Sequence, residues 1–93
     1  MTEAQFQRQV LQLAGLFRWA CYHTHDSRRS KSGFPDLVLV KPGRPVIFAE
    51  LKSDTGETSA EQDEWLTLLR TTPSQAFLWR PKDLIDIARI LGE

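Results

Sequence analysis

The sequence has few of the residues that hold soft metals or form disulfides. It contains one cysteine and two histidines in 93 residues, which are too few for a zinc site of the usual ligand spacing. A single cysteine excludes a disulfide within the chain and is typical of the reducing cytoplasm. No apolar run approaches the roughly 18–20 residues of a membrane span, and no basic and apolar leader is recognisable. We therefore expect a cytoplasmic protein that makes no membrane contact.

Net charge is also lacking, because 12 basic residues balance 12 acidic ones. The charges are nevertheless segregated. Between positions 26 and 52 the basic residues are Arg28, Arg29, Lys31, Lys41, Arg44 and Lys52, and the acidic ones are Asp26, Asp36 and Glu50. Positions 54–64 carry acidic charge alone, as a solvated helix start does. The local positive excess favours phosphate contact and predicts a nucleic-acid partner.

The apolar residues are sufficient for a packed domain. They make up 41% of the chain, which argues against disorder. We expect one domain, 1–93, with a small core that gains from association of two copies. Periodicity predicts helices near 2–18, 59–69 and 82–91, the last ended by Gly92, and strands near 19–23, 37–40, 46–49 and 76–79. The result is an α/β fold of order αβββαβα, with a mixed four-stranded sheet flanked by helices.

The second and third predicted strands are joined by five residues rich in proline and glycine, which indicates a hairpin. A symmetric hairpin pairs Val38 with Phe48 and Asp36 with Glu50. Carboxylates directly opposite each other, about 4.5–5.5 Å apart, repel, and a divalent cation would offset that repulsion. Lys52 follows Glu50 by two residues and shares its face. These three residues, the Asp–Glu–Lys cluster, predict an active site; the alternative is a surface hairpin with a Glu50–Lys52 ion pair and an Asp36 turn cap.

The ligand chemistry of this cluster suits a hard cation. Mg²⁺ is typically held by one or two carboxylates together with phosphate oxygens, and Mn²⁺ accepts the same ligands. We expect Asp36 and Glu50 to bind the metal, with the backbone carbonyl of Leu51 as a third oxygen. Lys52 would then orient an attacking water or stabilise charge on the scissile phosphate.

The cluster carries a family resemblance. Pro35-Asp36 followed by Glu50-Leu51-Lys52 resembles the PD-(D/E)XK nuclease signature. The wider pattern consists of Lys31-Ser32-Gly33-Phe34-Pro35-Asp36-Leu37, Glu50-Leu51-Lys52, Gly56, Gln62 and Trp65. It resembles the virus-type replication-repair nuclease (VRR-NUC) family, in its small stand-alone phage and bacterial form, over almost the whole chain.

The resemblance implies a restriction-endonuclease-like core and metal-dependent hydrolysis of DNA phosphodiesters during DNA repair. It further implies branched substrates such as four-way (Holliday) junctions, products with 5′-phosphate and 3′-hydroxyl ends, and a homodimer. No recognition helix for base readout is visible in the sequence, so selectivity should depend on DNA shape. The alternatives are a sequence-specific restriction-type nuclease and a catalytically silent DNA-binding module of the same fold.

Two polar residues lie on helix stripes that are otherwise apolar. Glu3 precedes Phe6 by three residues, and Gln62 precedes Leu66 by four. If both point toward the Asp–Glu–Lys cluster, Glu3 would bind the metal through a water, and Gln62 would orient the nucleophile or hold the lysine. The alternatives are local, since the helix dipole favours glutamate in a first turn and Gln62 can form a capping box with Ser59.

A polar, basic segment leads into the cluster from position 23 onward. We expect Arg28, Arg29 and Lys31 to contact the DNA backbone, with Ser30 as a further phosphate donor. Gly33 would allow close approach of the backbone to metal or DNA. An ordinary solvated loop is the alternative.

Overall fold

The computed structural model describes residues 1–24 and 32–93. Its elements are α1 (Glu3–Leu16), β1 (Ala20–His23), β2 (Leu37–Val40), β3 (Ile47–Leu51), α2 (Ala60–Leu69), β4 (Gln75–Trp79), the 3-10 turn η1 (Pro81–Asp83) and α3 (Leu84–Gly92). The predicted order αβββαβα is confirmed, with element ends displaced by two residues or fewer.

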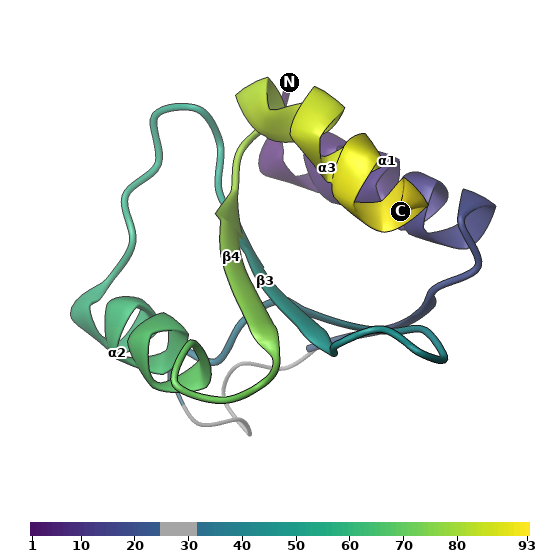
Figure 1. The fold of residues 1–93 in the computed structure, drawn as a ribbon. Helices are drawn as coiled ribbons and strands as arrows, with labels where there is room; N and C mark the ends of the chain where they lie inside the picture. The colour runs from purple at the N-terminus through teal and green to yellow at the C-terminus, as the bar shows by residue number, and fades with distance from the viewer. Residues whose placement is uncertain (25–31) are drawn as a thin grey trace.

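The four strands form one mixed sheet in the order β1-β2-β3-β4. The β1–β2 and β2–β3 pairs are antiparallel, whereas β3 and β4 are parallel. A parallel pair requires a crossover, and α2 provides it. Helices α1 and α3 lie together on one side of the sheet, and α2 lies on the other (Figure 1).

Helices α1 and α2 both begin with a capping box. In α1, the Thr2 hydroxyl accepts from the Gln5 backbone N–H at 3.1 Å, and Gln5 Oε1 accepts from the Thr2 N–H at 2.7 Å. In α2, Ser59 and Gln62 make the same pair of bonds at 3.2 and 2.9 Å. These reciprocal bonds satisfy N–H groups that a helix start otherwise leaves without partners.

The main core lies between the sheet and the α1–α3 layer. The strand residues buried there are Leu37, Leu39, Ile47, Ala49 and Leu51. The helix residues that cover them are Phe6, Val10, Ala14, Ile87 and Leu91. Because side chains alternate along a strand, the intervening positions of β2 and β3 project toward α2. The hairpin pattern thereby directs Glu50 to the α2 side of the sheet.

The last helix begins later and ends later than predicted. Pro81–Asp83 form a 3-10 turn before α3, and Gly92 is the final residue of α3 instead of its stop. A Cβ at Gly92 would lie 3.2 Å from the ring of Phe17, so packing against α1 accounts for this glycine. None of the α-helices in the described ranges has the length and apolar character needed to cross a bilayer.

Candidate active site

The strand register that the sequence predicts is confirmed. Val38 pairs with Phe48, and Leu37 pairs with Ala49. The next step of the same register brings Asp36, just before β2, to Glu50. Asp36 is anchored there, because its Oδ2 accepts a hydrogen bond of 2.8 Å from the Leu51 backbone N–H.

Glu50 is a charged residue that is buried, with only 2% of its surface exposed. Its Oε2 accepts a hydrogen bond of 3.0 Å from Gln62 Nε2. Its Oε1 is buried and has no hydrogen-bond partner among the described residues. Leaving a buried acceptor unsatisfied costs about 1–3 kcal/mol, and more if it is charged. An oxygen in this state, next to a second carboxylate, is suited to a cation ligand.

The electrostatics of Glu50 agree with that geometry. The pKa of Glu50 is raised from 4.5 to about 9, chiefly because the carboxyl is buried and next because the Asp36 carboxylate lies beside it. The ammonium of Lys52 acts in the opposite direction, and the charge of Glu3 adds a smaller increase. The raised pKa favours the protonated form of Glu50 near neutral pH when no cation is bound. A bound cation would take the place of that proton.

Lys52 completes the cluster from the end of β3. Its side chain is half-buried, and its charge acts on Glu50. Its backbone N–H donates to the Trp79 carbonyl at 3.0 Å, which continues the β3–β4 pairing one residue beyond Leu51. The structure therefore brings Asp36, Glu50 and Lys52 together, as the hairpin pattern predicts.

Gln62 forms the capping box and also bonds to a residue of the cluster. Its Oε1 accepts from the Ser59 N–H in the capping box, while its Nε2 donates to Glu50. The partner in the cluster is thus Glu50 and not Lys52, so the expectation that Gln62 holds the lysine is wrong. The amide ties the start of α2 to the buried carboxylate.

Glu3 is placed differently from expectation. It is exposed, because the buried stripe of α1 begins one turn later, at Phe6. Its charge still reaches the cluster, since it contributes to the raised pKa of Glu50. Across the described residues, no group of three or more histidine, cysteine, aspartate or glutamate side chains is arranged to hold a metal. The protein side chains at this site are therefore a pair of carboxylates.

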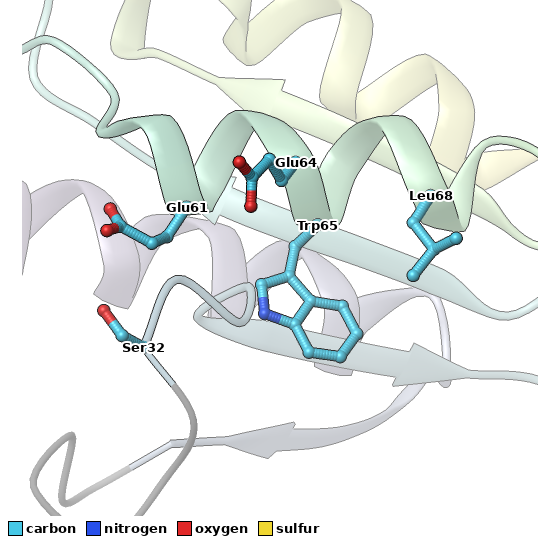
Figure 2. A pocket seen from close by; sticks show the side chains of 5 residues that line it. All are labelled: Ser32, Glu61, Glu64, Trp65 and Leu68. Carbon is cyan, nitrogen blue, oxygen red and sulfur yellow. The ribbon is translucent and has the colours of Figure 1, made fainter.

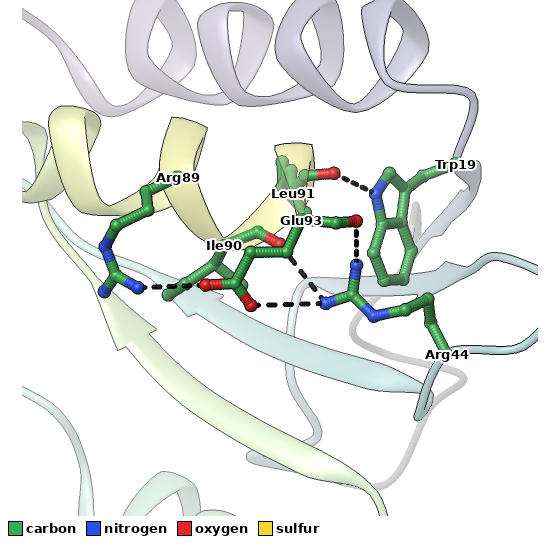
Figure 3. Close-up of polar contacts among 6 residues, drawn as sticks. All are labelled: Trp19, Arg44, Arg89, Ile90, Leu91 and Glu93. Carbon is green, nitrogen blue, oxygen red and sulfur yellow. Dashed lines mark hydrogen bonds and ion pairs between the residues drawn. The ribbon is translucent and has the colours of Figure 1, made fainter.

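Two basic residues of the expected positive region lie elsewhere. Lys41 and Arg44 belong to the turn between β2 and β3, at the opposite end of the hairpin from the cluster. Their charged groups lie 5.9 and 5.2 Å from the ring centroid of Trp19. Arg44 also donates to the carbonyls of Glu93 and Ile90 at 2.7 and 3.3 Å (Figure 3). The expectation that positive charge gathers around the site is wrong for these two residues.

The expected DNA contacts Arg28, Arg29, Ser30 and Lys31 lie outside the described residues. Gly33 is described and has a φ of +88°. A Cβ there would lie 2.6 Å from the backbone carbonyl carbon of Glu61. In the structure, the close approach that requires glycine at position 33 is to α2.

Sequence reasoning also missed a residue that packs beside the cluster. Phe34 makes edge-to-face contacts with Phe48 of β3 and Trp65 of α2, at centroid distances of 5.9 and 5.1 Å. It lies two residues before Asp36, so period-2 alternation was the available signal. These rings fill the space between the sheet and α2.

A hollow between α2 and the segment at Ser32 has a different character. It is lined by Ser32, Glu61, Glu64, Trp65 and Leu68 (Figure 2). The rings and methyl groups of Trp65 and Leu68 form its apolar part, and two glutamates lie beside them. Negative charge repels phosphate, so this face is unsuited to the DNA backbone.

A family match covers most of the chain. Residues 2–82 match the VRR-NUC domain. A segment of 47 residues, 50% of the chain, is 43% identical to the Fanconi-associated nuclease 1 homolog of Schizosaccharomyces pombe, of which it covers only 7%.

Two solved structures share the fold. A VRR_NUC domain protein aligns over 100% of this chain and 92% of its own, with a TM-score of 0.72 and 20% identity. The Holliday junction resolvase Hjc of Archaeoglobus fulgidus aligns over 84% of this chain and 68% of its own, with a TM-score of 0.59 and 26% identity. The chain therefore belongs to the VRR-NUC domain family and has the PD-(D/E)XK nuclease fold.

Proposed function

We propose that this chain is a metal-dependent endodeoxyribonuclease that hydrolyses phosphodiester bonds in branched DNA, such as four-way junctions. The observation that carries the proposal is the buried Glu50 Oε1, which lacks a partner among the described residues and lies beside Asp36. Membership of the VRR-NUC family supports nuclease activity. The likeness to Hjc, a Holliday junction resolvase, supports a junction substrate.

The residues present fit a divalent cation. Asp36 and Glu50 would hold Mg²⁺, or Mn²⁺ in its place, with the Leu51 carbonyl as a third oxygen, and such hard oxygen donors match both ions. When bound, the cation would neutralise phosphate charge and acidify a water molecule. Glu3 would reach it through a water from the start of α1.

The remaining roles belong to the chain itself. Lys52 would stabilise the negative charge that develops on the phosphate oxygens in the transition state. The Gln62 amide holds Glu50 by one oxygen and so leaves the other directed into the site. The Leu51 N–H holds Asp36 in the same way. These contacts preorganise the carboxylates before substrate arrives.

DNA would approach the cluster from the side of the basic segment. Arg28, Arg29, Lys31 and Ser30 would contact the sugar–phosphate backbone, which positions a duplex without reading its sequence. Selectivity would then follow the shape of the substrate.

We further propose a homodimer. Leu13, Leu16 and Leu84 line one shallow hollow along α1 and α3. Leu16 is 72% exposed, and Ile85 on the adjoining turn of α3 is 86% exposed. A two-fold contact would cover this apolar surface on both copies and would hold two active sites at a fixed separation.

A cleavage assay tests the function. Purified chain is incubated with four-way, flap and linear duplex DNA, with Mg²⁺, with Mn²⁺ and with excess chelator. The proposal expects metal-dependent cuts in the branched substrates and slow cutting of the linear duplex. Cuts at one sequence in linear DNA would favour a restriction-type nuclease. Junction binding without cleavage under any of these metals would favour the silent module.

A further inference from the structure

Arg80 lies at the carboxyl end of β4 and fastens the turn that follows Lys52. Its Nη1 donates to two backbone carbonyls, that of Ser53 at 2.6 Å and that of Gly56 at 2.7 Å. The side chain is half-buried. Hydrogen bonds from a charged donor are stronger than those from a neutral donor, so Arg80 stabilises the position of residues 53–56.

That turn lies against the side chain of Lys52. A Cβ placed on Gly56 would be 3.5 Å from Lys52 Cδ and 3.1 Å from Ser53 Oγ. The Gly56 N–H donates to Ser53 Oγ at 3.0 Å. Gly56 therefore lies beside the aliphatic part of the Lys52 side chain, close enough that a side chain at position 56 would touch it.

Further bonds connect the same two segments. The Lys52 N–H donates to the Trp79 carbonyl at 3.0 Å, and the Lys82 N–H donates to Asp54 Oδ1 at 3.2 Å. The N–H of Arg80 is itself bound by Asp83 Oδ2 at 2.9 Å. The backbone of Arg80 is therefore held in place, and its guanidinium binds the turn at residues 53–56.

We propose that Arg80 is a positioning residue for Lys52. By holding the carbonyls of Ser53 and Gly56, Arg80 would keep the turn at 53–56 beside the Lys52 side chain and so limit the directions that the ammonium can take. This inference rests on the proposed role of Lys52 in DNA cleavage. Misplacement of a catalytic group by about 1 Å is enough to lower a rate by about 100-fold.

The chain contains its own control for a purely structural arginine. Arg44 also donates to two backbone carbonyls, those of Glu93 and Ile90 (Figure 3). It lies at the opposite end of β3 from Lys52. Loss of Arg44 removes a comparable pair of bonds and leaves the turn at 53–56 untouched.

The test compares Arg80→Ala, Arg80→Lys and Arg44→Ala in Mg²⁺-dependent junction cleavage, at a temperature where all three are folded. For Arg80→Ala we expect kcat to fall by about 10- to 100-fold with little change in KM. Arg80→Lys keeps the charge but not the planar fork, so it should also be slow. Arg44→Ala should stay within about twofold of wild type in kcat. Equal losses in Arg80→Ala and Arg44→Ala would overturn the inference.

A double variant tests whether Arg80 acts through Lys52. If it does, adding Arg80→Ala to Lys52→Ala causes no further loss of rate beyond about twofold, since the residues are coupled. If the rate losses of the two single variants multiply in the double variant, Arg80 acts independently of Lys52 and the inference is contradicted.

Amide hydrogen exchange supplies a readout that does not depend on activity. The Gly56 amide should exchange faster in both Arg80 variants and at the wild-type rate in Arg44→Ala. If the wild-type chain cleaves none of the DNA substrates, the proposed function fails and the catalytic half of this inference fails with it, while Gly56 exchange still decides whether Arg80 holds the turn. Unchanged Gly56 exchange in Arg80→Ala would refute the attachment itself.

Discussion

Gln62 donates a hydrogen bond of 3.0 Å to the buried carboxylate of Glu50 while its own oxygen caps the first turn of α2. One side chain therefore connects the start of a helix with the centre of the candidate site. The position of α2 on the sheet and the orientation of Glu50 depend on each other through this amide.

Gln62→Glu separates the two roles. A glutamate at this position keeps a capping-box acceptor but removes the N–H donor and adds negative charge beside Glu50. We expect a loss of about 1–3 kcal/mol of stability, because Glu50 Oε2 loses its donor, and a fall in cleavage rate of about tenfold or more. Gln5→Glu in the matching capping box of α1 is the control, and it should leave the rate unchanged. Similar rates for the two variants would mean that Gln62 is only a cap.

Asp36→Asn and Glu50→Gln should abolish cleavage and leave the fold and DNA binding largely intact. Each removes one of the two carboxylates that would bind the metal, and the removed negative charge does not attract DNA. Activity is measured on a four-way junction, and binding by mobility shift in chelator. Glu64→Gln, at an exposed position of α2 outside the cluster, controls for loss of one negative charge. Full cleavage by either site variant, or by wild type in excess chelator, would contradict the metal assignment.

The protonation of Glu50 predicts a pH-dependent stability in the absence of metal. Its pKa is about 9 in the folded chain against 4.5 as the ordinary value, so the folded state binds more protons than the unfolded state between these two pH values. The stability contributed by this group is complete below about pH 4.5 and is lost as pH rises through about 9.

The measurement is the difference in Tm between wild type and Glu50→Gln in chelator at pH 6, 7.5 and 9. We expect wild type to lose Tm relative to the variant as pH rises, because a neutral amide has no proton to lose. Mg²⁺ should restore Tm most strongly at the highest pH, since it binds the ionised carboxylate. A Tm difference that does not change with pH would show that Glu50 is not held protonated.

Lys52→Ala should reduce turnover more than it weakens DNA binding. One ammonium at the reacting phosphate acts mainly on the transition state, whereas backbone contact is shared among several basic residues. Single-turnover rates and binding constants at one salt concentration separate the two effects. Lys41→Ala is the control, since Lys41 lies over Trp19 at the other end of the hairpin. Normal rate with poor binding in Lys52→Ala would reverse the assigned role.

The sequence predicted the parts of the site that depend on local rules. The register that pairs Asp36 with Glu50 follows from a five-residue turn and a two-residue period, and both capping boxes follow from residues three apart. Tertiary placement was less accessible. Lys41 and Arg44 are far from the site because they lie in the turn at the other end of the hairpin, where their charged groups contact the ring of Trp19, between α1 and β1.

Contacts between distant segments were not available from the pattern at all. The glycine at position 33 fits the backbone of Glu61 in α2, and the arginine at position 80 binds carbonyls more than 20 residues earlier. Such contacts depend on how whole elements pack, which periodicity does not encode. The exposure of Glu3 has the same origin, because the inward stripe of α1 begins only where the helix meets the sheet.

A dimer formed through α1 and α3 should be broken by one charge. Ile85 is 86% exposed, so Ile85→Glu leaves the core unchanged but places a carboxylate on the apolar surface that two copies would share. We expect light scattering at micromolar concentration to give twice the chain mass for wild type and the monomer mass for the variant. In a two-fold dimer the same residue lies on both sides of the contact, so one substitution would place two carboxylates in it.

Activity then shows whether the dimer matters for branched DNA. If two sites act on opposite strands of a junction, monomeric Ile85→Glu should nick one strand at a time and lose paired cuts, while each site remains intact. Asp86→Lys is a matched control, since it changes charge at the neighbouring exposed position without touching the apolar surface. A monomeric wild type, or equal rates on a four-way junction and a plain linear duplex, would contradict the dimeric, structure-selective enzyme.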